Sequence, residues 1–133
     1  MITIVLVDDH KMVRDGIKRL LEDEPDFKVI GEAENGAEGI RQAEELKPDI
    51  LVTDLMMKGP NGIDVSREVR KKSPATKVII LTMYNDSGYV HRAMKEGAKG
   101  YVVKGSGIDE LIAAIRKVNS GEYYLSPSVA YKK

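Results

Sequence analysis

The feature that most constrains the fold is a set of short, strongly apolar runs separated by longer segments with helical periodicity. Four runs are rich in Val and Ile and too short to be helices: residues 2–7, 50–53, 78–81 and 101–103. Continuous apolar runs of this length are typical of strands buried on both faces, as in a parallel sheet. A fifth run, residues 27–34, mixes apolar and polar residues, and we interpret it as an edge strand.

Helical patterns fill the intervals between these runs. After the first stripe of apolar residues, Pro25 is a stop signal for the helix. Asn35 is a candidate N-cap of the second helix, because an acid follows three residues later at Glu38. The positions that we expect on the buried faces of the five helices are Val13, Ile17, Leu20 and Leu21; Ile40 and Ala43; Ile63, Ser66 and Val69; Val90, Ala93 and Met94; and Ile108, Leu111, Ile112, Ile115 and Val118.

A strand followed by a helix, repeated five times, predicts a doubly wound α/β sandwich with a parallel sheet. Right-handed crossovers then place helices on both faces of that sheet. The length of 133 residues fits one domain. Because the pattern fades after Gly121, we assign residues 1–121 to the domain and interpret residues 122–133 as a linker or the start of a further C-terminal region.

Composition excludes several classes of function. The 21 Lys and Arg residues balance 21 Asp and Glu residues, whereas a dedicated nucleic-acid binder usually has a basic excess. The chain has no Cys, which excludes disulfides, thiolate catalysis and Cys-based metal centres. The two His residues, His10 and His91, lie far apart, and we expect both on helix surfaces. The N-terminus has neither a basic leader nor the roughly 20 apolar residues of a membrane span, so we expect an intracellular soluble domain.

The residues that end the apolar runs are the candidates for chemistry, because ligands bind beyond the carboxyl ends of the strands in open α/β sheets. The first run ends at Asp8 and Asp9, and the third strand ends at Asp54. The fourth strand ends at Thr82, and the fifth ends at Lys104. If these strands are neighbours, three carboxylates, one hydroxyl and one ammonium group converge at one edge of the sheet.

Such a cluster requires a cation. Two carboxylates about 4 Å apart repel each other by about 4 kcal/mol at an effective dielectric constant of about 20. Three of them are unstable unless a cation joins them or one is protonated. Mg²⁺ is the natural cation, because it prefers oxygen ligands and keeps several waters. A phosphoryl group on that ion would meet Thr82 as a hydrogen-bond donor and Lys104 as a point charge. One Asp can act as the nucleophile, and position favours Asp54.

Each of these residues also has an ordinary structural interpretation. Asp8 or Asp9 is suited to cap the first helix, and Asp54 is suited to a turn. Thr82 is a common strand residue, and Lys104 alone would be a solvated surface lysine. The joint pattern favours a site, because all five residues fall at strand ends with matching chemistry.

These residues give the sequence its resemblance to a response-regulator receiver domain of two-component signalling, over residues 2 to about 121. Several details are also similar to the NarL/FixJ subfamily, whose members usually carry a helix-turn-helix DNA-binding domain after the receiver. The motifs that carry the family resemblance are Val7-Asp8-Asp9, Thr53-Asp54-Leu55-Met56-Met57 with Gly62 eight residues after Asp54, Leu81-Thr82, and Tyr101-Val102-Val103-Lys104. The subfamily details are Asp9-His10, Leu81-Thr82-Met83-Tyr84 and residues 121–127.

The resemblance implies a flavodoxin-like fold with five parallel strands in the order 2-1-3-4-5 and five helices. It also implies that Asp54 accepts a phosphoryl group from a sensor histidine kinase. Asp9 would bind Mg²⁺ directly and Asp8 through water, and Asp54 and the backbone carbonyl of Met56 would complete the protein ligands.

The resemblance further assigns a signalling role. Thr82 and Lys104 would contact the phosphoryl group, and Tyr101 would be the aromatic switch that changes rotamer as Thr82 moves. Packing of Tyr101 against the fourth helix is the plain alternative, and both roles are compatible. The implied protein is a cytoplasmic switch and not an enzyme. Its partners would be the kinase, a second copy on phosphorylation, and DNA through a C-terminal domain absent from this chain, with no membrane contact.

The sequence departs from the family pattern at three positions. Lys58 and Gly105 stand where Pro is frequent, and Met83 stands where a small residue is frequent. We hypothesise that the bulk of Met83 restricts access to Asp54 and slows loss of the phosphoryl group.

Three rival functions stay open at this point. A stand-alone receiver would act by docking alone. A phosphohydrolase of the haloacid-dehalogenase type needs a second Asp two residues after the nucleophile, where this chain has Met56. A flavodoxin-like binding module needs a phosphate-cradling loop after the first strand, but Asp8-Asp9-His10 would repel phosphate without a metal.

Overall fold

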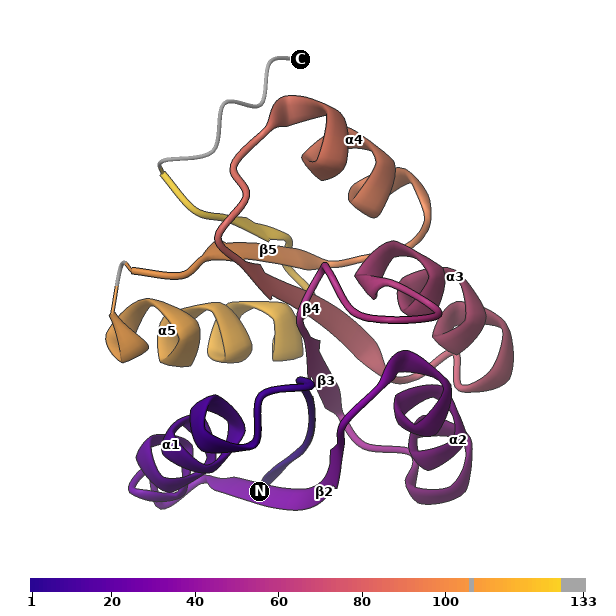
Figure 1. The fold of residues 1–133 in the computed structure, drawn as a ribbon. Coiled ribbons are helices and arrows are strands. Elements are labelled where there is room, and N and C mark those ends of the chain that lie inside the picture. The colour runs from indigo at the N-terminus through magenta and orange to yellow at the C-terminus, as the bar shows by residue number, and fades with distance from the viewer. Residues whose placement is uncertain (106, 128–133) are drawn as a thin grey trace.

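Strands and helices alternate along the chain in a computed structural model that describes residues 1–105 and 107–127 (Figure 1). The strands are β1 (Ile2–Val7), β2 (Phe27–Ala33), β3 (Ile50–Thr53), β4 (Lys77–Thr82), β5 (Gly100–Val103) and β6 (Tyr124–Leu125). The helices are α1 (Lys11–Glu22), α2 (Gly36–Leu46), α3 (Gly62–Lys72), α4 (Ser87–Lys95) and α5 (Ile108–Asn119). No helix within these described ranges is both long enough and apolar enough to pass through a bilayer.

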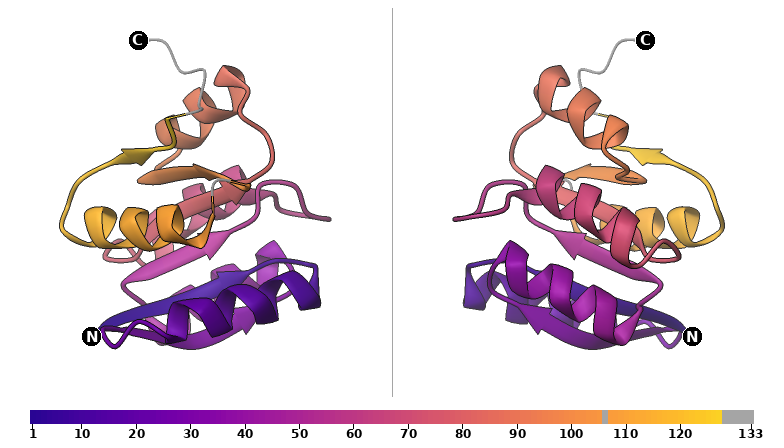
Figure 2. Two further views of the ribbon diagram at one scale, coloured as in Figure 1. Left: turned by 90° about the vertical axis from the view of Figure 1, so that its left-hand side faces the viewer. Right: turned by 90° about the vertical axis from the view of Figure 1, so that its right-hand side faces the viewer.

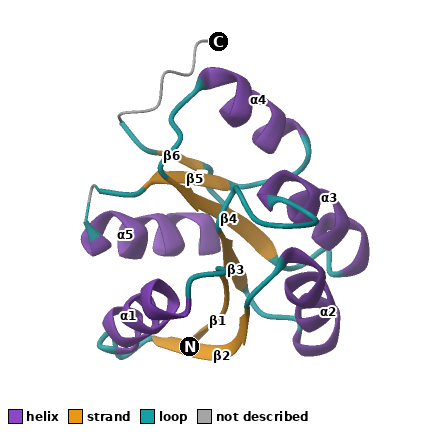
Figure 3. Ribbon diagram, in the orientation of Figure 1, coloured by secondary structure: helices purple, strands orange, loops and turns teal. Residues whose placement is uncertain are grey.

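All six strands join one parallel sheet in the order β2-β1-β3-β4-β5-β6 (Figure 3). The predicted fold class and the order of the first five strands are confirmed. The predicted count of five strands is wrong by one, because β6 pairs with β5 at Gly100 and Tyr101. A strand of two residues is too short to produce a periodic signal in the sequence. It lies in the segment that we interpreted as a linker; residues 128–133 of that segment lie outside the described residues.

Helices cover both faces of the sheet, as the alternation predicts (Figures 1 and 2). On β1, Ile4 and Leu6 pack into a core beneath α1 and α5. Val5 and Val7 point the other way, into a core beneath α2 and α3. This two-sided burial explains why the central strands are apolar without interruption.

The apolar stripe of α1 is less buried than its spacing predicts. Leu21 is fully buried, whereas Val13 and Leu20 are 42% and 44% exposed. These two exposed residues border a surface groove between α1 and the start of α5, lined also by Ile17 and Ile108. The periodicity of the stripe identifies the helix, but it does not show how far the neighbouring α5 extends over it.

Two adjacent leucines of α1 allow a matched test of this difference. Leu21→Ala should lower the free energy of unfolding by about 2–5 kcal/mol, because it leaves a cavity in a closed core. Leu20→Ala should cost less than about 1 kcal/mol, because Leu20 is already 44% exposed. Both changes alter helix propensity equally, so the difference reports burial alone. Urea denaturation of the two variants measures it, and equal losses would contradict the assigned orientation of α1.

Candidate functional site

Four of the five residues expected at the strand ends lie close together, namely Asp8, Asp9, Asp54 and Lys104. Lys104, which follows β5, places its Nζ atom 3.6 Å from Asp8 Oδ2 and 3.6 Å from Asp54 Oδ2. The ligand atoms of Asp8, Asp9, His10 and Asp54 all lie within 4.8 Å of one another. Parallel pairing of β1 with β3 brings Asp8 and Asp54 together, since Val7 is in register with Thr53. This set of carboxylate oxygens fits a hard divalent cation.

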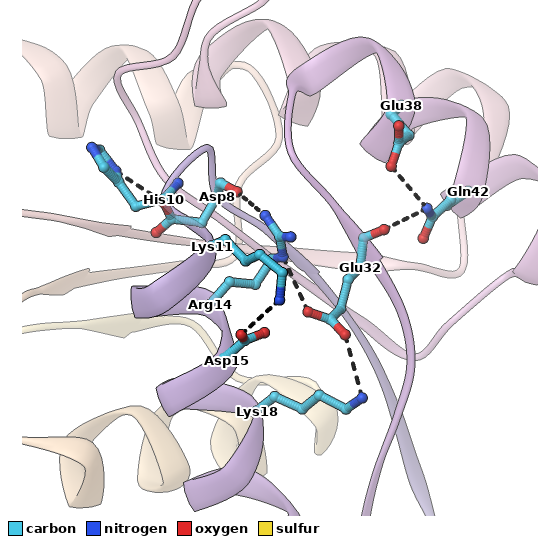
Figure 4. Close-up of polar contacts among 9 residues, drawn as sticks. All are labelled: Asp8, His10, Lys11, Arg14, Asp15, Lys18, Glu32, Glu38 and Gln42. Carbon is cyan, nitrogen blue, oxygen red and sulfur yellow. Dashed lines mark hydrogen bonds and ion pairs between the residues drawn. The ribbon is translucent and has the colours of Figure 1, made fainter.

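Asp8 is held in place through its backbone and its side chain (Figure 4). Its backbone N–H donates to the Ala33 carbonyl at 3.0 Å, and its Oδ1 atom accepts from the backbone N–H of His10 at 2.8 Å. Arg14 on α1 donates from Nη1 to the Asp8 carbonyl at 2.6 Å and from Nε to Glu32 Oε1 at 3.0 Å. The planar guanidinium group therefore ties the loop after β1 to the neighbouring strand β2.

Arg14 was not among the candidates from the sequence. Its side chain is 11% exposed, so a charged group lies on the inner side of α1. A signal was present, because Arg14 precedes Ile17 by three residues and Leu21 by seven, which places it on the same helical face.

The surroundings of Asp54 disfavour the charged form of its carboxyl group. Burial is the main cause that raises the pKa of its carboxyl group above the ordinary value, and Asp8 and Asp9 raise it further. Lys104 opposes this shift, as does the Leu55 N–H, which donates to Asp54 Oδ1 at 2.8 Å. A cation that joins the cluster would relieve the repulsion that raises this pKa.

The loop that follows Asp54 returns directly beneath it. The Gly62 N–H donates to the Leu55 carbonyl at 2.8 Å. A Cβ atom at Gly62 would lie 2.7 Å from the Asp54 carbonyl oxygen, which is closer than real contacts of this kind. Gly62 is therefore required by a close approach of two backbones. A capping box between Asn61 and Asp64, which the sequence analysis did not identify, starts α3 at this point.

Thr82 and Tyr101 meet at one loop residue, Tyr84. Thr82 is buried at the end of β4, and its Oγ1 atom accepts from the Tyr84 N–H at 3.2 Å. Tyr101 is fully buried, and its hydroxyl donates to the Tyr84 carbonyl at 2.6 Å. Burial is the main cause that raises the pKa of Tyr101 to about 12. Its ring packs with Val90 and Ala93 of α4, as expected for the plain alternative.

Two exposed methionines lie in the loops that follow Asp54 and Thr82. Met56 is 45% exposed and lines an open hollow together with Asp9, next to the departure from the family pattern at Lys58. Its carbonyl as a metal ligand stays a prediction. Met83, directly after Thr82, is 68% exposed. The third departure, Gly105, has φ near +100°, a conformation that suits glycine.

His10 lies nearer to the acidic cluster than its expected place on a helix surface indicates. The side chain is exposed, as expected, but its Nδ1 atom lies 3.0 Å from Asp9 Oδ1 and 3.3 Å from Asp8 Oδ1. As the N-cap residue of α1, His10 is carried to the same sheet edge as the aspartates. His91 is exposed on α4, as expected.

Comparisons with known proteins agree with this geometry. The family model of the response regulator receiver domain matches residues 4–116. The transcriptional regulatory protein LiaR of Bacillus subtilis is 42% identical over 99% of this chain and 63% of its own length. The nitrate/nitrite response regulator protein NarL of Escherichia coli is 39% identical over 96% of this chain and 59% of its own length.

A solved structure extends the similarity to three dimensions. A two-component response regulator of the LuxR family from Aurantimonas sp. SI85-9A1 superposes with a TM-score of 0.92 at 41% identity. The alignment covers 96% of this chain and 91% of that one. The chain thus spans about three fifths of the length of the two curated relatives but most of this solved structure.

One explanation accounts for the matched residues, the sheet order and the acidic cluster that faces Lys104. The chain belongs to the response-regulator receiver family of two-component systems.

Proposed function

We propose that the chain is a phosphorylation switch in which Asp54 accepts a phosphoryl group from a sensor histidine kinase. The observation that carries this proposal is the contact of Lys104 with both Asp8 and Asp54 at 3.6 Å in the acidic cluster. A carboxylate with a raised pKa beside a fixed ammonium group is poised to react with an anionic donor once its charge is balanced.

The chemical step uses the two oxygens of Asp54 differently. The Leu55 N–H restrains Oδ1, whereas Oδ2 faces Lys104. A carboxylate oxygen attacks phosphorus in line, and the bond between phosphorus and the donor imidazole nitrogen breaks. The electron pair stays on that nitrogen, which takes a proton from solvent. Lys104 then pairs with the phosphoryl oxygens.

Asp8, Asp9, Asp54 and the Met56 carbonyl would hold the cation, and Arg14 keeps the Asp8 end of that set in place. Mg²⁺ at this position supplies positive charge that balances the carboxylates and the incoming phosphoryl group. The carboxylate set favours it, because Mg²⁺ prefers oxygen ligands and retains water.

Phosphorylation changes the conformation of the domain through Thr82. If its hydroxyl turns toward a phosphoryl oxygen, it releases the Tyr84 N–H. The Tyr101 hydroxyl donates to the carbonyl of the same residue, and Tyr84, once freed from Thr82, can follow that hydroxyl. The population of Tyr101 conformers therefore shifts toward the buried one. The shift is limited by the difference in phosphoryl contacts between the two states.

The output that best fits the relatives is transcription regulation. LiaR is a transcriptional regulatory protein, and NarL is a response regulator. We therefore propose that the chain acts in the cytoplasm on DNA through a C-terminal domain, with a homodimer formed on phosphorylation. A stand-alone receiver is the second candidate. The phosphohydrolase alternative is weaker, because the position two residues after Asp54 is an exposed Met56.

The first test is phosphorylation by acetyl phosphate, followed by intact mass. The native chain should gain one phosphoryl group with Mg²⁺ and none with EDTA. Asp54→Asn should gain none, because the nucleophile is gone, whereas Asp15→Asn, which removes an exposed acid on α1, should behave as the native chain. A full gain in Asp54→Asn would refute the assignment.

The raised pKa of Asp54 predicts a stability effect with a defined sign. Because this pKa is higher in the folded state, the stability that Asp54 contributes is complete at low pH and is lost as the pH rises through the raised value. In EDTA at pH 7, Asp54→Asn should therefore unfold at higher urea concentration than the native chain, and the difference should vanish in acid.

Magnesium should reverse this order. At a Mg²⁺ concentration of 100 times Kd, the native chain gains about 2.7 kcal/mol by mass action, and the variant lacks one ligand. Urea curves with and without Mg²⁺ measure both effects. A variant that is less stable than the native chain in EDTA at pH 7 would contradict the electrostatic interpretation of the cluster.

The bulk of Met83 predicts a slow loss of the phosphoryl group. Met83→Ala should lose the phosphoryl group faster. The Met83 side chain directly follows Thr82, and its removal would give water easier access to Asp54. Met12→Ala, which changes an 87% exposed methionine on α1, is the matched control. The decay of the phosphorylated mass after removal of donor gives both rates, and equal rates would remove this role for Met83.

A further inference from the structure

The segment after α5 is held against the strand that carries the proposed switch residue. The Tyr124 N–H donates to the Lys99 carbonyl at 3.0 Å, and the Ser126 N–H donates to the Tyr101 carbonyl at 2.9 Å. The Val103 N–H donates to Ser126 Oγ at 2.9 Å. Residues 122–127, here named the strap, therefore bind the backbone of β5 on both sides of Tyr101 and next to Lys104.

A partly buried acid on α5, Glu110, fixes the strap from the other side. Glu110 Oε2 accepts from the Tyr124 hydroxyl at 2.8 Å and from Ser126 Oγ at 2.8 Å. Ser126 is 3% exposed and bridges α5 to β5, because its hydroxyl donates to Glu110 while accepting from Val103. Hydrogen bonds to a charged acceptor are stronger than neutral ones, so this network adds to the backbone hydrogen bonds that attach the strap.

The strap also joins the apolar surroundings of Tyr101. Leu125 packs against the core cluster that contains Tyr101 and Val90. The Tyr101 ring is thus enclosed by α4 and the strap, while its hydroxyl is anchored on Tyr84. A change of Tyr101 rotamer would disturb this packing, so the conformer of Tyr101 and the attachment of the strap are energetically linked.

We propose that the strap is the element that transmits the state of Asp54 to the chain beyond residue 127: its attachment to β5 and Glu110 favours the buried Tyr101 conformer, and phosphorylation tightens that attachment. This inference rests on the proposed function. Linkage is reciprocal, so an attached strap stabilises the phosphorylated state by the same factor as phosphorylation stabilises the attachment.

The test is amide hydrogen exchange by NMR on the full chain, with Mg²⁺ and with or without an excess of acetyl phosphate. Phosphorylation should slow exchange at Tyr124, Ser126 and Val103. Ser126→Ala removes both hydroxyl contacts and should speed exchange at Val103 and Tyr124 about tenfold, the scale of a buried hydrogen bond to a charged group. It should also reduce the slowing that phosphorylation causes.

Two variants keep the result specific. Ser120→Ala makes the same chemical change at an exposed site on the cap of α5. This hydroxyl contacts Lys117 and the first strap residue, Glu122, but neither β5 nor Glu110, so exchange at Tyr124, Ser126 and Val103 should match the native chain. Tyr124→Phe removes one bond to Glu110 and should give an effect in the same direction as Ser126→Ala.

Intact mass of the same samples separates failure of the strap proposal from failure of the proposed function. If Asp54 is phosphorylated but exchange in the strap is unchanged or faster, the strap proposal is overturned and the proposed function stands. Equal behaviour of Ser126→Ala and Ser120→Ala would overturn it as well. If no phosphoryl group is gained, both proposals fall.

Discussion

Burial of the sheet on both faces is the constraint from which the rest of the structure follows. Strands β1, β3 and β4 place alternate side chains into two apolar cores, so a charged group within them would have to leave water without compensation. Parallel pairing then brings every carboxyl end to the same edge. Charged side chains that follow these strands meet there by topology, and Asp8, Asp54 and Lys104 are found together for that reason.

The same convergence creates an electrostatic conflict at that edge. Burial raises the pKa of Asp54, and the two neighbouring aspartates add to the effect, while Lys104 offsets part of it. Arg14 contributes without touching a carboxylate of the cluster, because it binds the Asp8 carbonyl and balances its own charge on Glu32. The site is thus rigid in its backbone and unbalanced in its charge, a combination suited to a ligand that brings positive charge.

Sequence patterns predicted the elements of this fold and the strand-end residues, because both depend on local period and polarity. They did not separate Leu20 from Leu21, since exposure on α1 depends on how far α5 reaches over it. The pairing of Arg14 with Glu32 joins residues from two elements and has no local signature. The position of His10 beside Asp9 depends on its rotamer, and β6 is too short to show periodicity.

The short strand β6 has a second consequence, for solubility. Without it, β5 would be the edge of the sheet, and the backbone groups of a strand containing buried Tyr101 and Val102 would face solvent. Apolar edges of this kind pair readily with strands of other molecules and start aggregation. β6 occupies that edge with only two residues, and the exposed Tyr123 and Glu122 precede it. The contact that attaches the strap to β5 therefore also keeps the sheet from growing into a neighbouring copy.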